Sequence, residues 1–139
     1  MHKTILDTDI LSDFLRGKNT NVVRHAEAYL REHGRLTISV ITAFEIVRGR
    51  HQAQQFERAA QFLDWTKSAE LLAFDYACAR LGGEIAGTLL RSGATVGVAD
   101  TLIGATAVVH GITLVSANIE HYQRLAAFGL RIENWRDAQ

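Results

Sequence analysis

The chain alternates short apolar runs with longer stretches in which apolar residues recur at helical spacing. The short runs, which predict strands, cover residues 5–6, 36–40, 71–74, 112–115 and 130–132. Helical spacing extends over residues 10–15, 22–33, 75–91, 97–110 and 118–128. Strands that alternate with helices favour parallel pairing, with helices packed on the sheet. The pattern predicts an α/β protein: a three-layer α/β/α sandwich around a central, mostly parallel sheet.

Glycines and short polar residues mark where the helices should begin and end. Three glycines follow a last periodic apolar residue, where helices commonly end: Gly17, Gly34 and Gly111. Asp9 is the better N-cap candidate for the first helix. Thr42, followed by Glu45 three residues later, fits a capping box at the start of a further helix. Glu45 therefore has an ordinary structural explanation beside any chemical one.

Size and composition favour one domain, residues 1–139, because no second composition regime appears. Lysine plus arginine equals aspartate plus glutamate, at 15 each, so net charge provides no long-range attraction to nucleic acid or membrane. No apolar stretch approaches the ~20 residues of a membrane span. The single cysteine, Cys78, fits a reducing compartment and a core position. We therefore expect a soluble cytoplasmic protein with no membrane partner.

Four acidic or amide residues stand just beyond a predicted strand or near a helix start. They are Asp7, Glu45, Asp100 and Asn118. Ligands of an open parallel sheet bind outside the carboxyl ends of its strands, so these residues are expected to converge. Convergent carboxylates repel one another unless a cation lies between them, and oxygen donors suit Mg²⁺ or Mn²⁺. Asn118, a neutral donor, is the weaker metal ligand.

Three further polar residues are expected to support these ligands from behind: Thr8, Asp9 and Ser116. The two hydroxyls can hold a water or a phosphate oxygen, and Asp9 can brace the site. Each of the residues singled out also has an ordinary interpretation, as a helix cap or a turn hydroxyl. Only their joint placement at strand ends and helix starts favours a metal site.

Other chemistries find less support. The six histidines show no zinc-binding spacing, and no glycine-rich phosphate loop is present. The segment Leu6–Asp9 also resembles the opening of haloacid-dehalogenase-type phosphatases, in which the first aspartate is a nucleophile. Those enzymes need a distal lysine, and Lys67 is the only lysine beyond residue 18. A non-catalytic binding module with the same fold is a further alternative.

Several segments together resemble the PIN-domain family, and within it the VapC-type toxins of prokaryotic toxin–antitoxin pairs. These segments are Leu6–Ser12, Ser39–Glu45, Gly97–Ala107, Leu114–Tyr122 and the closing Leu130–Trp135. The resemblance implies that Asp7, Glu45 and Asp100 are catalytic metal ligands. Asn118 stands at the family's fourth position, where many relatives have aspartate, and Ser116 stands where threonine is commoner.

The same resemblance implies an activity and partners. It implies a Mg²⁺- or Mn²⁺-dependent endoribonuclease that cleaves single-stranded RNA. It also implies a homodimer that is held inactive by a cognate antitoxin. Basic residues near strand ends or helix starts are candidate RNA contacts: Lys18, Arg48, Arg50 and Arg91. A stripe of small residues predicts a close helix contact, which a second subunit could supply: Ala79, Gly82, Gly83, Ala86 and Gly87.

Overall fold

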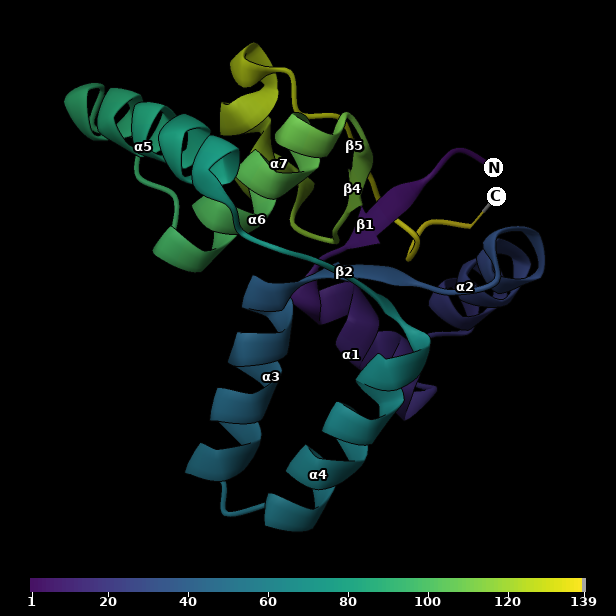
Figure 1. Ribbon diagram of the computed structural model, residues 1–139. Coiled ribbons are helices and arrows are strands. Elements are labelled where there is room, and N and C mark those ends of the chain that lie inside the picture. Colours follow the sequence, from purple (N-terminus) through teal and green to yellow (C-terminus); the bar gives the residue numbers. More distant parts are fainter. Residues whose placement is uncertain (139) are drawn as a thin grey trace.

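A five-stranded parallel sheet forms the centre of the computed structural model, which describes residues 1–138 (Figure 1). Its strands are β1 (Thr4–Leu6), β2 (Thr37–Ser39), β3 (Glu70–Leu72), β4 (Thr113–Val115) and β5 (Ile132–Glu133). Their order is β3-β2-β1-β4-β5. β1 is central, with Leu6 opposite Ile38 of β2 and Val115 of β4. The predicted α/β fold is confirmed, and every strand pair is parallel.

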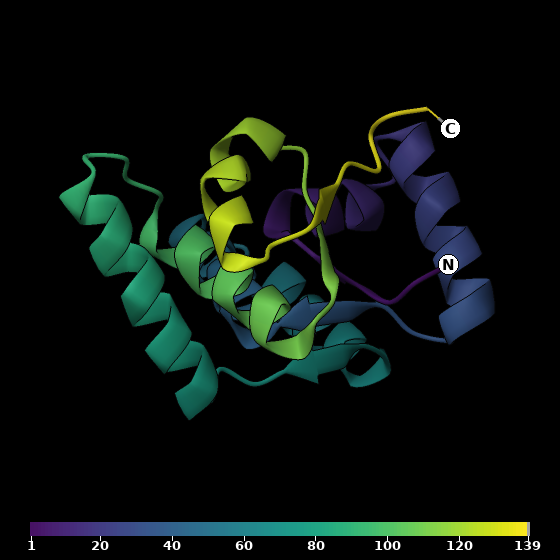
Figure 2. The same cartoon turned by 90° about the horizontal axis from the view of Figure 1, so that it is seen from above.

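Seven α-helices accompany the sheet within residues 1–138. They are α1 (Thr8–Arg16), α2 (Thr20–His33), α3 (Val40–Gln52), α4 (Phe56–Trp65), α5 (Tyr76–Arg91), α6 (Val98–His110) and α7 (Ile119–Tyr122). Two 3₁₀ helices, η1 (Thr66–Ser68) and η2 (Gln123–Phe128), follow α4 and α7. In both views α2 and α5 lie at opposite ends of the molecule (Figures 1 and 2). None of the described helices is both long and apolar enough to cross a lipid bilayer.

Two apolar clusters fill the space on either side of the sheet. Leu6 and Val115 belong to the cluster that contains residues of α1 to α4. Ile5 and Leu114, one position earlier on the same strands, belong to the cluster that contains residues of α5, α6, α7 and η2. Successive strand residues point to opposite faces, so this alternation divides the helices between two layers. The result is the three-layer arrangement that the sequence pattern predicts.

Several element boundaries differ from the prediction. The helix α4 was not predicted, because only Ala59 and Phe62 of its ten residues are buried and polar residues dilute the pattern. The single helix predicted over 118–128 is instead the short α7 followed by the 3₁₀ helix η2. The strand predicted at 71–74 covers Glu70–Leu72, and the last strand is Ile132–Glu133 instead of 130–132. The predicted helix ends at Gly17, Gly34 and Gly111 are confirmed, each with a positive φ angle.

The helix α3 begins earlier than predicted, which removes the capping box. Its N-cap is Ser39, whose hydroxyl accepts a hydrogen bond from the backbone N–H of Ile41 at 2.9 Å. Thr42 therefore lies inside the first turn, and Glu45 lies in the second. The capping-box explanation of Glu45 is wrong because β2 ends at Ser39 and the helix follows at once. The Glu45 side chain is left free for contacts outside its own helix.

The small residues of α5 have two different surroundings. A Cβ atom on Gly82 would lie 3.6 Å from Leu102 and 3.7 Å from Ala105, both on α6. Gly82 therefore faces α6 of its own chain, at a spacing that a methyl group would fill with ordinary van der Waals contacts. A Cβ atom on Gly83 or Gly87 would meet no atom within 4 Å, and both residues are exposed. Only the exposed part of the stripe is available for contact with a second subunit.

Candidate active site

The predicted site residues lie at the carboxyl end of the sheet. Asp7 directly follows the central strand β1, and Ser116 directly follows its neighbour β4. On the other side of β1, the strand β2 leads straight into α3, which carries Glu45. Asp100 lies in the first turn of α6. Segments far apart in the sequence thus meet around the end of β1, as expected from the parallel topology.

Asp7 is the most buried of the acidic residues, with 6% of its surface exposed. Its carboxylate accepts hydrogen bonds from the Thr8 backbone N–H and from the Ser116 hydroxyl, each at 2.9 Å. The pKa of Asp7 is raised to about 7, mainly by burial and next by the negative charge of Asp9. The two hydrogen bonds lower this pKa, and the Asp100 charge adds a smaller increase. The carboxylate therefore lies in an apolar, negatively charged setting.

Asp7, and not Asp9, is the N-cap of α1, so the prediction that Asp9 caps this helix is wrong. The short strand β1 ends at Leu6, and the helix begins at Thr8. Asp9 instead accepts hydrogen bonds from the backbone N–H groups of Ile10, at 2.7 Å, and Ala117, at 3.2 Å. The second bond ties α1 to the loop after β4. Asp9 thus links α1 to the residue after Ser116, and its role as a supporting residue of the site stays a prediction.

Glu45 reaches across to α1. The Thr8 hydroxyl donates a hydrogen bond to Glu45 Oε1 at 2.7 Å, and it lies 3.2 Å from the Thr42 hydroxyl. Since Thr8 is the residue next to Asp7, this contact brings the Glu45 carboxylate to the edge of the same site. Thr8 therefore links the segment of Asp7 to Glu45, with Thr42 in the same network, and its supporting role in the site stays a prediction.

Asp100 is held by two residues of α7 that were given no role in the sequence analysis. The Tyr122 hydroxyl donates to Asp100 Oδ1 at 3.1 Å, and His121 Nε2 lies 3.0 Å from Oδ2. Tyr122 is fully buried, and burial raises the pKa of its phenol above its usual value. The charges of Asp7 and Asp100 raise that pKa further, so the phenol lies close to both carboxylates.

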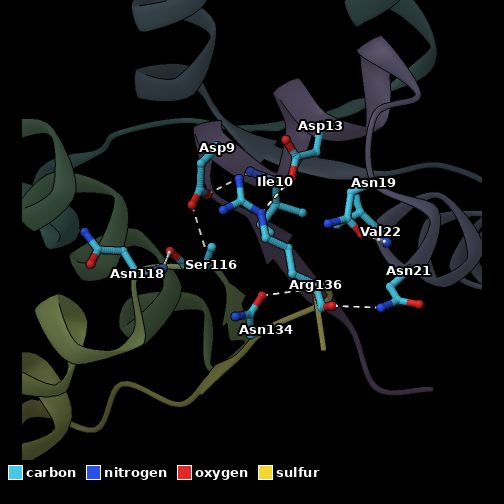
Figure 3. Close-up of polar contacts among 11 residues, drawn as sticks. Asp9, Ile10, Asp13, Asn19, Asn21, Val22, Ser116, Asn118, Asn134 and Arg136 are labelled. Carbon is cyan, nitrogen blue, oxygen red and sulfur yellow. Dashed lines mark hydrogen bonds and ion pairs between the residues drawn. The ribbon is translucent and has the colours of Figure 1, made fainter. Parts of the chain in front are cut away.

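Asn118 occupies the fourth predicted position with its side chain exposed. Its backbone N–H donates to the Ser116 hydroxyl at 3.0 Å, while its side chain makes no capping hydrogen bond to α7. Figure 3 shows the amide pointing away from Asp9 and Ser116. On the other flank, the Arg136 guanidinium extends toward α1 and pairs with Asp13 at 2.7 Å (Figure 3).

The donor set suits a hard divalent cation. Carboxylate, amide and hydroxyl oxygens surround the end of β1, and the one thiol, Cys78, is buried in α5. Within residues 1–138, no lysine or arginine pairs with the carboxylates of the three predicted metal ligands. In the same range, no three His, Cys, Asp or Glu side chains already stand in an arrangement that could hold a metal ion. The carboxylates are instead turned toward protein donors, and each keeps unused acceptor capacity.

The candidate RNA-contacting residues separate into different environments. Lys18 and Arg50 line a cavity between α1, α3 and α4. The Arg48 guanidinium lies over the Phe44 ring, 5.3 Å from its centroid. Arg91 is exposed at the end of α5 and lines neither of the cavities beside α1. Proximity in sequence to strand ends therefore identified only some residues that lie near the site.

Comparison with known proteins is consistent with this geometry. The PIN domain family matches residues 4–127. The tRNA(fMet)-specific endonuclease VapC of Shigella flexneri is 30% identical over 136 residues, which cover 97% of this chain and 99% of that protein. Ribonuclease VapC1 of Methanocaldococcus jannaschii is 30% identical over 131 residues, 94% of this chain and 86% of that protein. A chain in the crystal structure of DNA-bound VapBC from Salmonella typhimurium aligns with a TM-score of 0.82 and 29% identity, covering 97% and 99% of the two chains.

The chain therefore belongs to the PIN-domain family, within which it is a VapC-type ribonuclease toxin of a toxin–antitoxin system. The phosphatase alternative is not supported. The Lys67 ammonium group, which that alternative would need, lies in η1, is exposed, and pairs at 3.2 Å with the exposed Asp64 of α4.

Proposed function

We propose that this chain is a Mg²⁺- or Mn²⁺-dependent endoribonuclease that hydrolyses single-stranded RNA. The observation that carries the proposal is the buried Asp7 carboxylate at the end of the central strand, surrounded by other acids. Glu45 adjoins it through Thr8, and Asp100 adjoins it through Tyr122. No arginine or lysine within residues 1–138 pairs with these carboxylates, so a cation is the natural counter-charge.

In this proposal Asp7, Glu45 and Asp100 bind the metal ion, and Asn118 contributes a weaker, neutral oxygen. The bound ion would lower the pKa of the attacking water and stabilise negative charge on the phosphate and leaving oxygens. The neighbouring residues would act by orientation. The Ser116 hydroxyl and Thr8 N–H hold the Asp7 carboxylate, while Tyr122 and His121 hold that of Asp100. Hydrolysis would leave a 3′-hydroxyl on the upstream fragment.

The test is cleavage of a labelled single-stranded RNA by the purified chain. Cutting is expected with Mg²⁺ or Mn²⁺ and not with EDTA. The Asp7→Asn variant should be inactive although it keeps the shape of the side chain, whereas Asp64→Asn should cut normally, because Asp64 is exposed on α4. Equal cutting in EDTA, or normal cutting by Asp7→Asn, would rule out the metal mechanism. Two relatives are named for action on tRNA(fMet), which makes it the first natural RNA to test.

The proposed partners are a cognate antitoxin and a second copy of this chain. Several similar solved structures are described as VapBC or toxin–antitoxin complexes. An antitoxin should inhibit by placing a basic side chain against the acidic site, which the same carboxylates would attract. Co-expression of a cognate antitoxin should relieve growth inhibition caused by this chain. Unrelieved toxicity would contradict this partner.

A further inference from the structure

A cationic cavity lies next to the candidate active site. Its volume is about 690 Å³, and it lies between α1, α3 and α4, which stand beside one another below the sheet in Figure 1. Four cationic side chains line it: Arg16, Lys18, Arg50 and Arg58. Among the described residues, no aspartate or glutamate lines it. Because the whole chain is neutral, this concentration of positive charge is a local feature.

The cavity is continuous with the site through shared residues. A second cavity, of about 340 Å³, is lined by Thr8 and Glu45. Arg16, Arg50 and Gln55 line both cavities. The helix α1 runs from Thr8 to Arg16, a rise of roughly 12 Å at 1.5 Å per residue. A groove therefore leads from the candidate catalytic residues to the cations over a length of a few nucleotides.

The lining cations have no partner within the part of the chain that the structure describes. None of the four forms an ion pair or donates a side-chain hydrogen bond to another residue of 1–138. The Arg50 Nε atom is buried and has no hydrogen-bond acceptor. A buried donor without an acceptor destabilises a protein, and like charges in one cavity repel. An anionic ligand would satisfy the donor and neutralise the repulsion.

The other residues of the cavity favour a nucleic acid over a small anion. Phe62 and Trp65 of α4 stack with ring centroids 5.9 Å apart, and both line the cavity. Trp65 is partly exposed, which leaves aromatic surface for a base. Two glutamines, Gln55 and Gln61, add amide donors and acceptors. Cations for phosphates together with aromatic rings for bases are the usual means of binding single strands.

We propose that this cavity binds single-stranded RNA next to the cleaved bond, with Arg16, Lys18, Arg50 and Arg58 contacting its phosphates. The inference rests on the proposed ribonuclease function and adds the path of the substrate strand. It assigns substrate binding to Arg16 and Arg58, which sequence position alone did not indicate.

The test measures binding without cleavage. The full chain with Asp7→Asn, in EDTA, is titrated against a fluorescein-labelled 12-nucleotide single-stranded RNA. Lys18→Gln and Arg58→Gln, both at exposed residues, are then added. Each lost phosphate contact on a single strand lowers the slope of log affinity against log salt by about 0.7, so two lost contacts lower it by about 1.4. Relative to 1 M salt, this difference weakens binding at 0.1 M salt by roughly 25-fold. The control carries Arg31→Gln and Arg80→Gln, which remove the same charge from α2 and α5, and should bind like the parent.

A second measurement uses the two tryptophans. Trp135 is 2% exposed, so quenching of fluorescence by RNA should come from Trp65 and disappear in Trp65→Phe. Unchanged affinity and salt slope in the Lys18→Gln/Arg58→Gln variant would overturn the inference. The inference would also be overturned if this variant kept its RNA affinity but lost affinity for a polyglutamate peptide, because the cavity would then be a peptide-binding site. Loss of RNA affinity in a chain whose wild type cuts no RNA would keep the cavity assignment and reject only the proposed function.

Discussion

Replacing Asp7 with Asn should change how the stability of the metal-free protein depends on pH. Burial gives the folded protein a pKa of about 7 for Asp7, against 3.8 for an unperturbed aspartate. The folded state therefore holds this proton more tightly than the unfolded state does. The associated stabilisation is fully present below about pH 4 and is lost as the pH rises through 7. At 1.36 kcal/mol per unit, the difference amounts to roughly 4 kcal/mol.

Asparagine fits the same place without a charge. Its oxygen can accept from the Thr8 N–H, and its amide can donate to the Ser116 hydroxyl, which already accepts from the Asn118 N–H and has two lone pairs. The Asp7→Asn variant should thus keep its packing and lose the pH dependence that Asp7 causes. Relative to wild type, it should become more stable by up to roughly 4 kcal/mol between pH 4.5 and pH 8.

The assay is urea denaturation of both proteins in EDTA at pH 4.5, 6 and 8, compared with Asp64→Asn as a control for an exposed carboxylate. The stability difference between Asp7→Asn and wild type should grow with pH, while that of the control should stay constant. Adding Mg²⁺ at pH 8 should stabilise wild type and leave Asp7→Asn unchanged. A difference that stays flat from pH 4.5 to pH 8 would refute the claim that Asp7 is a destabilised, buried anion.

Three more outcomes are expected. Ser116→Ala removes a hydrogen bond that lowers the pKa of Asp7. The pH at which RNA cleavage rises should therefore be higher in this variant, and an unchanged profile of kcat/KM against pH would contradict the prediction. Gly104→Ala should destabilise the protein by about 1–3 kcal/mol, because the new Cβ would lie 2.5 Å from the buried Leu125 side chain of η2. Gly49→Ala, in the exposed and open part of α3, should instead stabilise the protein by up to about 1 kcal/mol. Thermal denaturation compares the two variants, and similar shifts of Tm would contradict the prediction. Gly83→Leu should weaken the proposed homodimer in sedimentation experiments, and a wild-type monomer at micromolar concentration or a silent substitution would exclude this interface.

The sequence was most informative where one local rule determines position. The period of two along each strand places Ile5 and Leu6 on opposite faces, and it requires no knowledge of partners. The parallel topology then brings Asp7 and Ser116 together, although 109 positions separate them, because both directly follow paired strands. The position of these two residues could therefore be predicted before the structure was known.

Contacts between helices could not be predicted in the same way. The bond from Thr8 to Glu45 depends on how α1 packs against α3, and helical periodicity says nothing about that rotation. Tyr122 and His121 reach Asp100 only because α7 is a single short turn that directs both side chains toward α6. The capping-box error at Thr42 has a similar origin, since the point where a short strand becomes a helix is not visible in the apolar pattern.

The pairing of β1 with β4 also determines when the site can exist during synthesis. Residues 4–6 pair with residues 113–115, so the central strand lacks one neighbour until most of the chain has been made. Asp7 receives its Ser116 hydrogen bond, and Asp9 its Ala117 hydrogen bond, only after that pairing. Tyr122, which holds Asp100, comes later still. Long-range pairing of this kind is slow to form, and the sequence contains no proline that would delay it further. A growing chain thus lacks the complete candidate active site until translation has passed residue 122, which gives a partner synthesised alongside it time to be present first.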